Sequence, residues 1–452
     1  MNPGIAANQQ RLFLAFLAEL RPHVRRDSSL PRRIKEIFAR NRAIGSRDRK
    51  LYRELVYTWL RFLPWIEPFL TTGSDCRAAA SRQAAPGPAT SAGPTDEDIA
   101  AKITAWLAPE LKPTSHYRAA LCGDWPATPA TLAEKSTLLA AFVTGRANPP
   151  DEPSAEAARR DDSPYRFDPQ DLLPAWFHSH CPASFESPHL DAINSRASIW
   201  VRIQCNDRNL VLDEFRAQNW NFEQPADFPD AVCLPPNAEV AGTDAYRRGF
   251  VEIQDLGSQL VLAHAAIAPG GRWLDACAGA GGKTLQLARL LGPAGHVDAT
   301  DIRLDILDEL RDRAKRARLD NIAIVPEPSG HYAGVLVDAP CSGSGTWRRQ
   351  PHLKWYVKPE TITAFAQTQL EILTTNAPRL KPGGLLIYAT CSLSHHENRD
   401  VVEAFLKSHP QFAPETPTQN HGGNFDGLGT SLLPGTRNTD GFYVALLHKS
   451  TQ

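Results

Sequence analysis

The apolar residues of the first 70 positions recur at helical spacing. They form two stripes, namely Leu12, Phe13, Phe16, Leu17 and Leu20, and then Leu51, Leu55, Val56, Trp59 and Leu60. Residues three and four positions apart share one face of an α-helix, so each stripe predicts an amphipathic helix. Residues 9–70 are therefore predicted to be helical, with further helices around Ile99–Leu107 and Thr131–Phe142.

From Trp200 onward the pattern changes to short apolar runs separated by helical stretches. The runs predicted as strands are Trp200–Gln204, Arg272–Ala276, His296–Thr300, Ile322–Val325, Gly334–Asp338, Leu385–Thr390 and Phe442–Leu447. The predicted helices between them are Leu210–Gln218, Lys283–Leu291, Leu304–Ala317 and Thr361–Arg379. Strands that alternate with helices in this way predict a parallel sheet with helices on both faces.

Two stretches without apolar periodicity divide the chain. Residues 71–98 are rich in Ala, Pro, Gly and Ser, and residues 148–164 are rich in Pro and charge. Such composition predicts a flexible insertion and a linker. The predicted organisation is a helical domain at 1–147 that carries the insertion, the linker, a small α/β domain at 165–250 and a larger α/β domain at 251–452. Proline, at 37 of 452 residues, exceeds the usual ~5%.

Composition and charge narrow the class of protein. With 42% hydrophobic and 22% charged residues, the chain is not a wholly disordered or fibrous protein. Its formal net charge of −1 hides an asymmetry, because residues 1–70 carry fourteen Lys or Arg and six Asp or Glu, a local charge of +8, against −9 for the remainder. A basic terminus on an acidic body is typical of a nucleic-acid contact, although a solvated helical face rich in Arg gives the same charge.

The cysteines and the longest apolar runs indicate the compartment. The eight cysteines contain no C-x-x-C pair, so the spacing of a zinc finger is absent and no bound metal is expected. No stretch approaches the ~20 apolar residues of a membrane-spanning helix. The run from Leu12 to Ala18 lacks the cleavage site of a secretory signal. We expect a soluble, cytoplasmic protein with reduced thiols and no membrane contact.

A glycine-rich turn joins the second predicted strand to the helix after it. Gly279, Gly281 and Gly282 allow a ligand to approach the backbone closely at the start of that helix. A P-loop would need glycine where Cys277 stands, and a dinucleotide fingerprint would need glycine where Thr284 stands. Both phosphate-binding patterns are therefore incomplete. The alternative is a helix-packing turn that binds no ligand.

A carboxylate at the end of the next strand indicates which nucleotide this turn accepts. Asp301 closes the apolar run His296–Thr300, where it can accept hydrogen bonds from both hydroxyls of a ribose. Asp298 competes for this role but lies within the strand, and an Asp at a strand end is also common as a helix cap. A glycine loop without a phosphate pattern, followed by a ribose acid, favours S-adenosylmethionine, which carries adenosine and no phosphate.

Two cysteines follow two of the later predicted strands. Cys341 comes three residues after Asp338, and Cys391 follows Thr390. Since ligands bind outside the carboxyl ends of parallel strands, both thiols are expected at the same rim as the glycine loop. A thiolate beside a methyl donor fits methylation of a pyrimidine ring carbon, because its addition to carbon 6 of cytosine makes carbon 5 nucleophilic. Lys283 would assist by lowering the thiol pKa, and Asp338 by contacting the edge of an unstacked cytosine.

Together these motifs resemble the RNA cytosine-5 methyltransferases of the bacterial RsmB/Sun type. The matching segments are Asp275–Thr284, Asp338–Gly345, Trp347–Trp355, Ala389–Ser392, Glu397–Asn398 and Asp440–Ala445, with Trp200–Ile203, Tyr246–Gly249 and Val251–Gln259 upstream. The resemblance extends from about Pro174 to Lys449. It implies an α/β fold, with a Rossmann-like methyltransferase domain preceded by a small α/β domain that is RRM-like and binds RNA.

The resemblance also implies residue roles. Cys391 takes the place of the family's nucleophile, and Cys341 that of the thiol that helps to release the methylated product, with Asp338 and Lys283 beside them. The residues placed to bind S-adenosylmethionine are Cys277, Ala278, Gly279, Ala280, Gly281, Gly282, Lys283, Asp301 and Asp338. The family usually has Pro in place of Ala280. Its acid after the third strand is matched here only by Glu327, which leaves the adenine contact unassigned.

The N-terminal helices resemble a different module. Ala43–Tyr57, with Leu60 and Arg61, is similar to the NusB-like domain of the family members that act on ribosomal RNA. This implies 16S rRNA as the substrate rather than tRNA, which is the main rival. The hypothesis from another class is a non-catalytic RNA-binding ribosome-assembly factor, and the presence of both Cys341 and Cys391 argues against it. The expected partner is RNA, not DNA, and the expected state is a monomer.

Basic and aromatic residues alternate in the segment Trp347–Trp355. Arg348, Arg349, His352 and Lys354 lie between its two tryptophans. This pattern suits contact with the backbone and bases of RNA. It also suits a surface loop whose tryptophans are buried.

Overall fold

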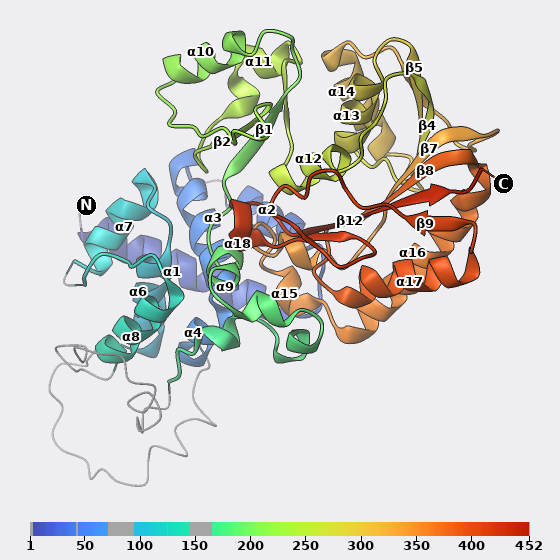
Figure 1. Ribbon diagram of the computed structural model, residues 1–452. Coiled ribbons are helices and arrows are strands. Elements are labelled where there is room, and N and C mark those ends of the chain that lie inside the picture. Colours follow the sequence, from blue (N-terminus) through green and yellow to red (C-terminus); the bar gives the residue numbers. More distant parts are fainter. Residues whose placement is uncertain (1–2, 42–43, 71–94, 124, 144–164, 452) are drawn as a thin grey trace, which may run out of the picture. The chain divides into compact units, whose positions relative to one another are not determined.

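The computed structural model describes residues 3–41, 44–70, 95–123, 125–143 and 165–451 (Figure 1). The predicted linker at 148–164 lies outside the described residues, as does all of the predicted insertion except residues 95–98. By their contacts the residues fall into two units, which we call the helical unit (Met1–Ala175 with Pro351–Tyr356) and the α/β unit (Trp176–Gln350 with Val357–Gln452). The finer division into four segments stays a prediction.

The helical unit buries both of the predicted apolar stripes. Its helices are α1 (Pro3–Leu20), α2 (Leu30–Arg40), α3 (Ser46–Arg61), α4 (Leu63–Ile66), α6 (Asp96–Leu107), α7 (Lys112–Leu121), α8 (Leu132–Val143) and α15 (Leu353–Tyr356). The stripe residues of α1 and α3 are buried, except for the half-buried Leu12. Phe16 packs edge-on against Phe38 and Tyr52, at ring-centroid distances of 5.4 and 5.2 Å. The predicted helical region is therefore confirmed.

Helix α6 begins three residues before the predicted start at Ile99. The reason is a capping box, in which the Asp98 N–H donates to Thr95 Oγ1 at 3.2 Å and the Thr95 N–H donates to Asp98 Oδ2 at 2.9 Å. This exchange satisfies free N–H groups in the first turn, so the polar residues Asp96 to Asp98 are helical although they add nothing to the apolar stripe.

The segment Pro351–Tyr356 packs within the helical unit, far in sequence from its other helices. The Lys354 side chain is fully buried, and its Nζ donates to the carbonyl oxygens of Arg61 and Leu172, both at 3.0 Å. Trp355 Nε1 donates to the Leu60 carbonyl at 2.7 Å. The last carbonyls of a helix have no partner within it, so Lys354 and Trp355 satisfy those at the end of α3.

The α/β unit contains a small antiparallel sheet in the order β2-β1-β3. The elements of this part are α9 (His189–Ile193), β1 (Ile199–Ile203), α10 (Asn209–Ala217), β2 (Ala231–Leu234), α11 (Asp244–Arg247) and β3 (Val251–Ile253). Val201 of β1 pairs with Val232 on one side and Ile253 on the other. The strand and helix predicted here, Trp200–Gln204 and Leu210–Gln218, are confirmed within one residue at each end. The likeness to an RRM stays a prediction.

The rest of the α/β unit is built on a nine-stranded sheet, among the residues described. Its elements are α12 (Leu256–Ala263), β4 (Gly271–Asp275), α13 (Gly282–Leu291), β5 (Gly295–Ala299), α14 (Ile306–Ala317), β6 (Ile322–Ile324), β7 (Tyr332–Asp338), α16 (Pro359–Asn376), β8 (Leu380–Thr390), α17 (Arg399–Ser408), β9 (Phe412–Pro414), β10 (Asn424–Phe425), β11 (Thr430–Leu432), α18 (Pro434–Arg437) and β12 (Phe442–Lys449). The strand order is β10-β11-β12-β8-β7-β4-β5-β6, and β9 pairs with β12.

The direction of the last strand corrects the prediction of a parallel sheet. Strands β4, β5, β6, β7 and β8 are mutually parallel, but β12 is antiparallel to β8 and β11 is antiparallel to β12. The sheet is therefore mixed. Apolar alternation identifies a strand but carries no information on its direction, which depends on the path of the connecting chain.

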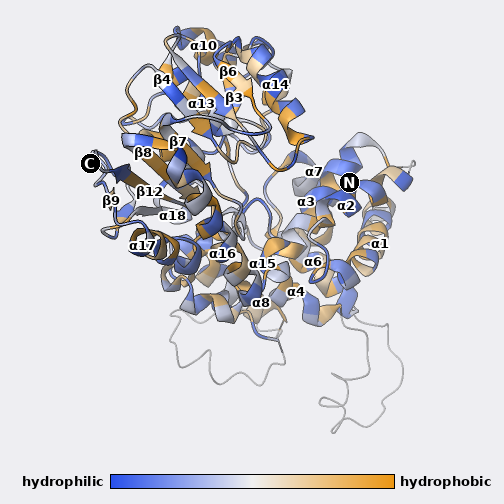
Figure 2. Cartoon of the chain, turned by 90° about the vertical axis from the view of Figure 1, so that its right-hand side faces the viewer, coloured by the Kyte–Doolittle hydropathy of each residue, from blue (hydrophilic) through white to orange (hydrophobic). Residues whose placement is uncertain are grey.

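Helices cover both faces of this sheet. Val335, Val337 and Tyr388 point to the face covered by α16 and α17, whereas Leu336 and Ile387 point to the face covered by α12 and α13. Strands buried on both faces are apolar at most positions, and orange is prominent where β7 and β8 are labelled in Figure 2. Asp275, Asp338 and Thr390 are the last residues of the parallel strands β4, β7 and β8, so these polar residues lie at the same edge of the sheet. No helix in the described part of the chain is long and apolar enough to cross a membrane.

Candidate functional site

A cavity of about 890 Å³ opens at the carboxyl ends of the parallel strands. Ten of the predicted site residues line it, namely Cys277, Ala278, Gly279, Ala280, Gly282, Lys283, Asp301, Asp338, Cys341 and Cys391. They follow β4, β5, β7 and β8, which are parallel and so end at the same edge. Gly281 and Glu327 do not line the cavity.

Gly281 shapes the glycine loop from behind the cavity. It is the residue before α13 and has a φ of +88°, in the left-handed region. A Cβ on Gly281 would lie 2.8 Å from Leu310 Cγ and 2.9 Å from Leu285 Cδ1, closer than atoms can approach. Only glycine therefore fits this turn.

Asp275, the last residue of β4, forms hydrogen bonds to the same loop and to the start of α13. Thr284 Oγ1 donates to Asp275 Oδ2 at 2.7 Å, which ties the end of β4 to the first turn of α13. Burial raises the pKa of Asp275 to about 7, because its carboxylate is removed from water. Asp275 does not line the cavity, and its Oδ1 accepts the Cys277 N–H at 3.4 Å, so it also acts on the backbone of the loop.

Asp301 faces the cavity beside the glycine loop. Its Oδ2 accepts the Gly279 N–H at 2.9 Å, and its Oδ1 accepts the Arg303 N–H at 2.9 Å. Burial acts to raise the pKa of Asp301, but the hydrogen bonds from Arg303 and Gly279 outweigh it and hold the pKa below its usual value. The carboxylate is therefore an ionised acceptor at the cavity wall.

The competing acid, Asp298, is engaged elsewhere. Its Oδ2 accepts from the Arg272 guanidinium at 2.5 Å and from the Tyr332 hydroxyl at 2.7 Å. Asp298 does not line the cavity. Of the two acids considered from the sequence, only Asp301 is placed where a ligand could reach it.

Lys283 pairs with Asp338 across the cavity wall. The Lys283 Nζ lies 2.8 Å from Asp338 Oδ2 and 5.0 Å from the centre of the Phe442 ring. Lys283 was expected to lower the pKa of a thiol, but its ammonium group forms an ion pair with the carboxylate of Asp338. Its charge therefore acts first on Asp338.

The two cysteines meet at the rim. Cys341 Sγ and Cys391 Sγ are 3.3 Å apart, within hydrogen-bonding distance for sulfur. The hydrogen bond to Cys391, together with burial, raises the pKa of the Cys341 thiol well above its usual value. Cys341 is therefore held as a neutral thiol beside the sulfur of Cys391.

Glu397 belongs to one of the segments that match the family, and the sequence indicates no role for it. In the structure it is fully buried and accepts hydrogen bonds from Ser342 and Ser392, the residues that follow the two cysteines. The motif spacing does not reveal this contact, because the two serines are 50 residues apart. Only the pairing of β7 with β8 brings them together.

The basic segment Trp347–Trp355 was predicted to be either an RNA contact or a surface loop with buried tryptophans, and most of its basic side chains are buried. Arg348, His352 and Lys354 are buried, whereas Arg349 is exposed. Burial lowers the pKa of His352 to about 4, so its imidazole is neutral at physiological pH. Three of the four basic side chains are therefore removed from solvent.

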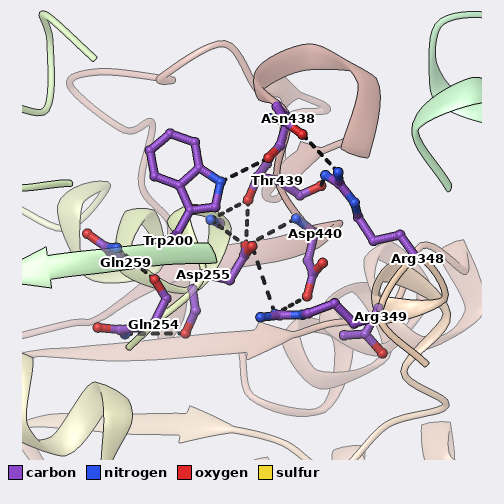
Figure 3. Close-up of polar contacts among 12 residues, drawn as sticks. Trp200, Gln254, Asp255, Gln259, Arg348, Arg349, Asn438, Thr439 and Asp440 are labelled. Atoms are coloured by element: carbon purple, nitrogen blue, oxygen red, sulfur yellow. Dashed lines mark hydrogen bonds and ion pairs between the residues drawn. The ribbon is translucent and has the colours of Figure 1, made fainter. Parts of the chain in front are cut away.

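Figure 3 shows where the two arginines of this segment go. Arg348 donates to the Thr439 carbonyl at 3.1 Å and to Asn438 Oδ1 at 2.8 Å. Arg349 is hydrogen-bonded to Asp440 and lies 3.9 Å from Asp255 Oδ2. Both arginines hold the turn that leads into β12.

Searches against known proteins agree with this arrangement. A sequence profile described as 16S rRNA methyltransferase RsmB/F matches residues 263–448. The ribosomal RNA small subunit methyltransferase B of Salmonella paratyphi A is 37% identical over 275 residues, covering 58% of this chain and 62% of that protein. The protein of the same name from Enterobacter sp. is 34% identical over 305 residues, covering 64% of this chain and 68% of that protein.

Solved structures show the same fold. The crystal structure of PH0851 superposes over 99% of both chains with a TM-score of 0.65 at 19% identity. NSun6 from Pyrococcus horikoshii with SFG superposes over 62% of this chain and 98% of that chain, with a TM-score of 0.57 at 16% identity. The Salmonella relative is matched over about 62% of its length, and the Enterobacter relative over more than two thirds. The chain therefore belongs to the RsmB/F family of rRNA methyltransferases.

Proposed function

We propose that the protein methylates carbon 5 of a cytosine in 16S rRNA, with S-adenosylmethionine as the methyl donor. The observation that carries this proposal is the cysteine pair. Two thiols 3.3 Å apart line one cavity together with a glycine loop and an ionised carboxylate. A thiol nucleophile and a nucleoside-binding wall are the two parts that this reaction needs.

The cavity suits S-adenosylmethionine in size and chemistry. The carboxylate of Asp301 is an acceptor for ribose hydroxyls, and the loop Cys277–Lys283 offers backbone at a helix N-terminus without a phosphate-binding pattern. Lys283 and Asp338 complete the wall toward the cysteines. When bound there, S-adenosylmethionine supplies the electrophilic methyl group that carbon 5 of cytosine takes up.

Cys391 is the proposed nucleophile. As a thiolate it adds to carbon 6 of an unstacked cytosine, and carbon 5 becomes enamine-like. The Cys341 thiol, kept protonated, donates a hydrogen bond that stabilises the Cys391 thiolate. Asp338, which is about one third exposed to the cavity, contacts the edge of the cytosine and favours protonation at N3.

Release reverses the first bond. Carbon 5 passes its proton to solvent in the open cavity, the bond between Cys391 and carbon 6 then breaks, and the thiolate is the leaving group. Cys341 acts at this stage because its sulfur lies against that of Cys391. The name of the curated relatives, small subunit methyltransferase B, and the basic N-terminal region support 16S rRNA as the substrate.

A methyl-transfer assay tests the proposal. Purified protein is incubated with labelled methyl donor and, in parallel, with unmodified 16S rRNA and unmodified tRNA, using wild type, Cys391→Ala and the control Cys205→Ala. Cys205 lies outside the cavity, with its Sγ 3.1 Å from the Asp207 carbonyl. We expect label in 16S rRNA for wild type and Cys205→Ala, and a loss of at least about 10³-fold for Cys391→Ala.

Three results would contradict the proposal. Equal rates for Cys391→Ala and wild type would show that Cys391 is not the nucleophile. Label in tRNA alone would show that 16S rRNA is not the substrate. RNA binding without any label would favour an assembly factor. Bisulfite sequencing of rRNA from a strain that lacks the protein then identifies the modified cytosine.

A further inference from the structure

Glu397 is a buried carboxylate behind the cysteine pair. It ends the 3₁₀ turn His395–Glu397, is 0% exposed, and does not line the cavity. Removal of a carboxylate from water is costly unless its oxygens are fully hydrogen-bonded. The identity of its partners therefore indicates what the residue is for.

The donors to Glu397 come from different parts of the chain. Oε1 accepts the Ser342 N–H at 2.7 Å and Gln369 Nε2 at 3.1 Å. Oε2 accepts the hydroxyls of Ser342 at 2.5 Å and Ser392 at 2.6 Å. A carboxylate accepts about four hydrogen bonds, so the group is saturated. These four donors are all neutral.

Both serines are direct neighbours of the cysteines. Ser342 follows Cys341, and Ser392 follows Cys391. One carboxylate oxygen accepts from both hydroxyls, so the loops after β7 and β8 are joined through a single atom. The side chain of Glu397 thus links the backbones that carry the two thiols.

The sheet itself does not hold the cysteines together. The ladder between β7 and β8 pairs residues as far as Asp338 and Ala389, and its last bond runs from the Ala339 N–H to the Ala389 carbonyl at 2.9 Å. Beyond that point the two chains leave the sheet. The Gly345 N–H donates to the Cys391 carbonyl at 2.9 Å, and the two sulfurs are 3.3 Å apart. Other links between the loops run through Glu397 and the hydroxyls of Ser342, Ser344 and Ser392.

A carboxylate suits this place better than an amide. All of its four hydrogen-bonding positions accept, whereas an amide carries two donors. With Gln at 397, the amide N–H₂ would face either the Ser342 N–H and Gln369 Nε2, which cannot accept, or the two serine hydroxyls, which would have to turn their own protons away from their present acceptor. Such a mismatch leaves a buried polar group unpaired, and the loops would move to relieve it.

We infer that Glu397 is a positioning residue, which holds the thiols of Cys341 and Cys391 in contact by accepting hydrogen bonds from the serines that follow them. The effect of Glu397 on methyl transfer rests on the proposed function, whereas the contact between the two thiols does not depend on it. Glu397 touches neither cofactor nor base, and it acts only through the two loops.

Cross-linking of the two thiols tests the inference directly. Full-length wild type, Glu397→Gln and Glu214→Gln are treated with dibromobimane, a short bifunctional thiol reagent, and the Cys341–Cys391 cross-link is quantified by peptide mass spectrometry. Glu214 is a matched control, since it accepts two backbone N–H groups, those of Asp244 and Ala245, in the small-sheet part of the unit. Methyl-transfer kcat, KM for RNA and the dissociation constant of the methyl donor are measured on the same samples.

The expected result for Glu397→Gln is a clear fall in cross-linking rate and a fall in kcat on the order of 10²-fold, as for an ångström-scale misplacement of a reacting group. The dissociation constant of the methyl donor and KM should stay near wild type, because the glycine loop and Asp301, which are proposed to hold the methyl donor, lie on other elements. Glu214→Gln should leave all four quantities unchanged.

The outcomes separate the inference from the proposed function. A folded Glu397→Gln protein with wild-type cross-linking overturns the inference, whatever its activity. Loss of the cross-link in a protein that never methylates RNA, even as wild type, supports the positioning role and overturns the proposed function. If Glu397→Gln does not fold, Ser392→Ala decides, since it removes one of the four hydrogen bonds and should slow cross-linking by several-fold. Unchanged cross-linking in Ser392→Ala overturns the inference.

Discussion

The sequence indicates chemistry at two places, the cavity rim and the basic segment Trp347–Trp355. In the structure the rim residues line a cavity, whereas most basic side chains of the segment are buried. At the rim, ten of the predicted residues line one cavity. In the basic segment, Arg348 and Lys354 are buried on carbonyl oxygens that lie far away in the sequence. The rim was predicted to bind a ligand, whereas for the basic segment the sequence left both an RNA contact and a surface loop open. In the structure Arg348, Arg349 and Lys354 all form hydrogen bonds within the protein.

The rim and the basic segment differ because the backbone alone places short side chains at strand ends, whereas it does not place the head groups of long basic side chains. Residues directly after a parallel strand must lie at the edge of the sheet, whatever their partners. A lysine or arginine reaches several ångströms from its backbone, and its head group settles where acceptors are available. Free carbonyls at the end of α3 are such acceptors. A basic pattern alone therefore does not distinguish RNA contacts from internal ones.

The largest effect should come from the rim. Cys341→Ala removes the thiol that lies against Cys391, so release should fail and a covalent complex of Cys391 with RNA should accumulate. We expect turnover to fall by about 10²- to 10⁴-fold. The complex is detected as a shifted band on a denaturing gel. It should vanish in Cys341→Ala/Cys391→Ala, and a band that persists in the double variant would assign the nucleophile to another residue.

Gly281→Ala tests whether the glycine loop is shaped from behind. A methyl group would meet Leu310 and Leu285 at less than 3 Å, and φ is +88°. We expect a loss of about 3 kcal/mol in the free energy of unfolding, from left-handed strain and overpacking together. Urea unfolding measures it.

The control for this loop is Gly427→Ala. Gly427 has a φ of +91°, but a Cβ there would meet nothing within 4 Å. Only the backbone strain of about 1 kcal/mol should therefore appear. Equal losses at the two glycines would show that the close contact with Leu310 is unimportant.

Arg348→Gln tests the basic segment itself. Because Arg348 is buried on Thr439 and Asn438, we expect a loss of about 1–3 kcal/mol in stability. The salt dependence of RNA binding should not change, since no phosphate contact is removed. Urea unfolding and binding titrations at several salt concentrations measure both quantities.

Arg25→Gln is the matched variant for that test. Arg25 is an exposed residue of the basic N-terminal region. If this region contacts RNA, the variant should keep its stability, and the slope of log K against log salt should become shallower by up to about one unit. If Arg348→Gln alone changed the slope of log K against log salt, the basic segment would contact RNA and the N-terminal region would not.

A pH trend in stability is expected from Asp275, which lies beside the glycine loop but outside the cavity. The folded protein keeps a proton on Asp275 up to about pH 7, whereas the unfolded chain releases it near the ordinary value of 3.8. The folded state binds more protons between these values, so ionisation destabilises it as the pH rises from about 4 to 7, and the penalty is constant above that. Asp275→Asn has no such proton. The stability of the variant relative to wild type should therefore increase from pH 5 to pH 7.5 in urea unfolding, and parallel pH curves would contradict the assignment.

The sequence by itself determined the local elements and the residues at strand ends. Apolar periodicity located the helices α1, α3, α6 and α8 and the strands β4, β5, β6, β7, β8 and β12, because burial follows directly from spacing. The order strand, glycine turn, helix placed the loop at Gly279–Gly282. The thiols of Cys341 and Cys391 followed from their positions after parallel strands.

The tertiary structure alone decided what depends on distant partners. The antiparallel direction of β12 is set by the chain between β8 and β12, which the alternation of residues does not encode. The contact of Glu397 with Ser342 and Ser392 exists only because β7 pairs with β8. The burial of Lys354 likewise requires the free carbonyls at the end of α3. Spacing along the chain determines which face a residue occupies, but hydrogen bonds between distant segments form only where the fold brings donor and acceptor together.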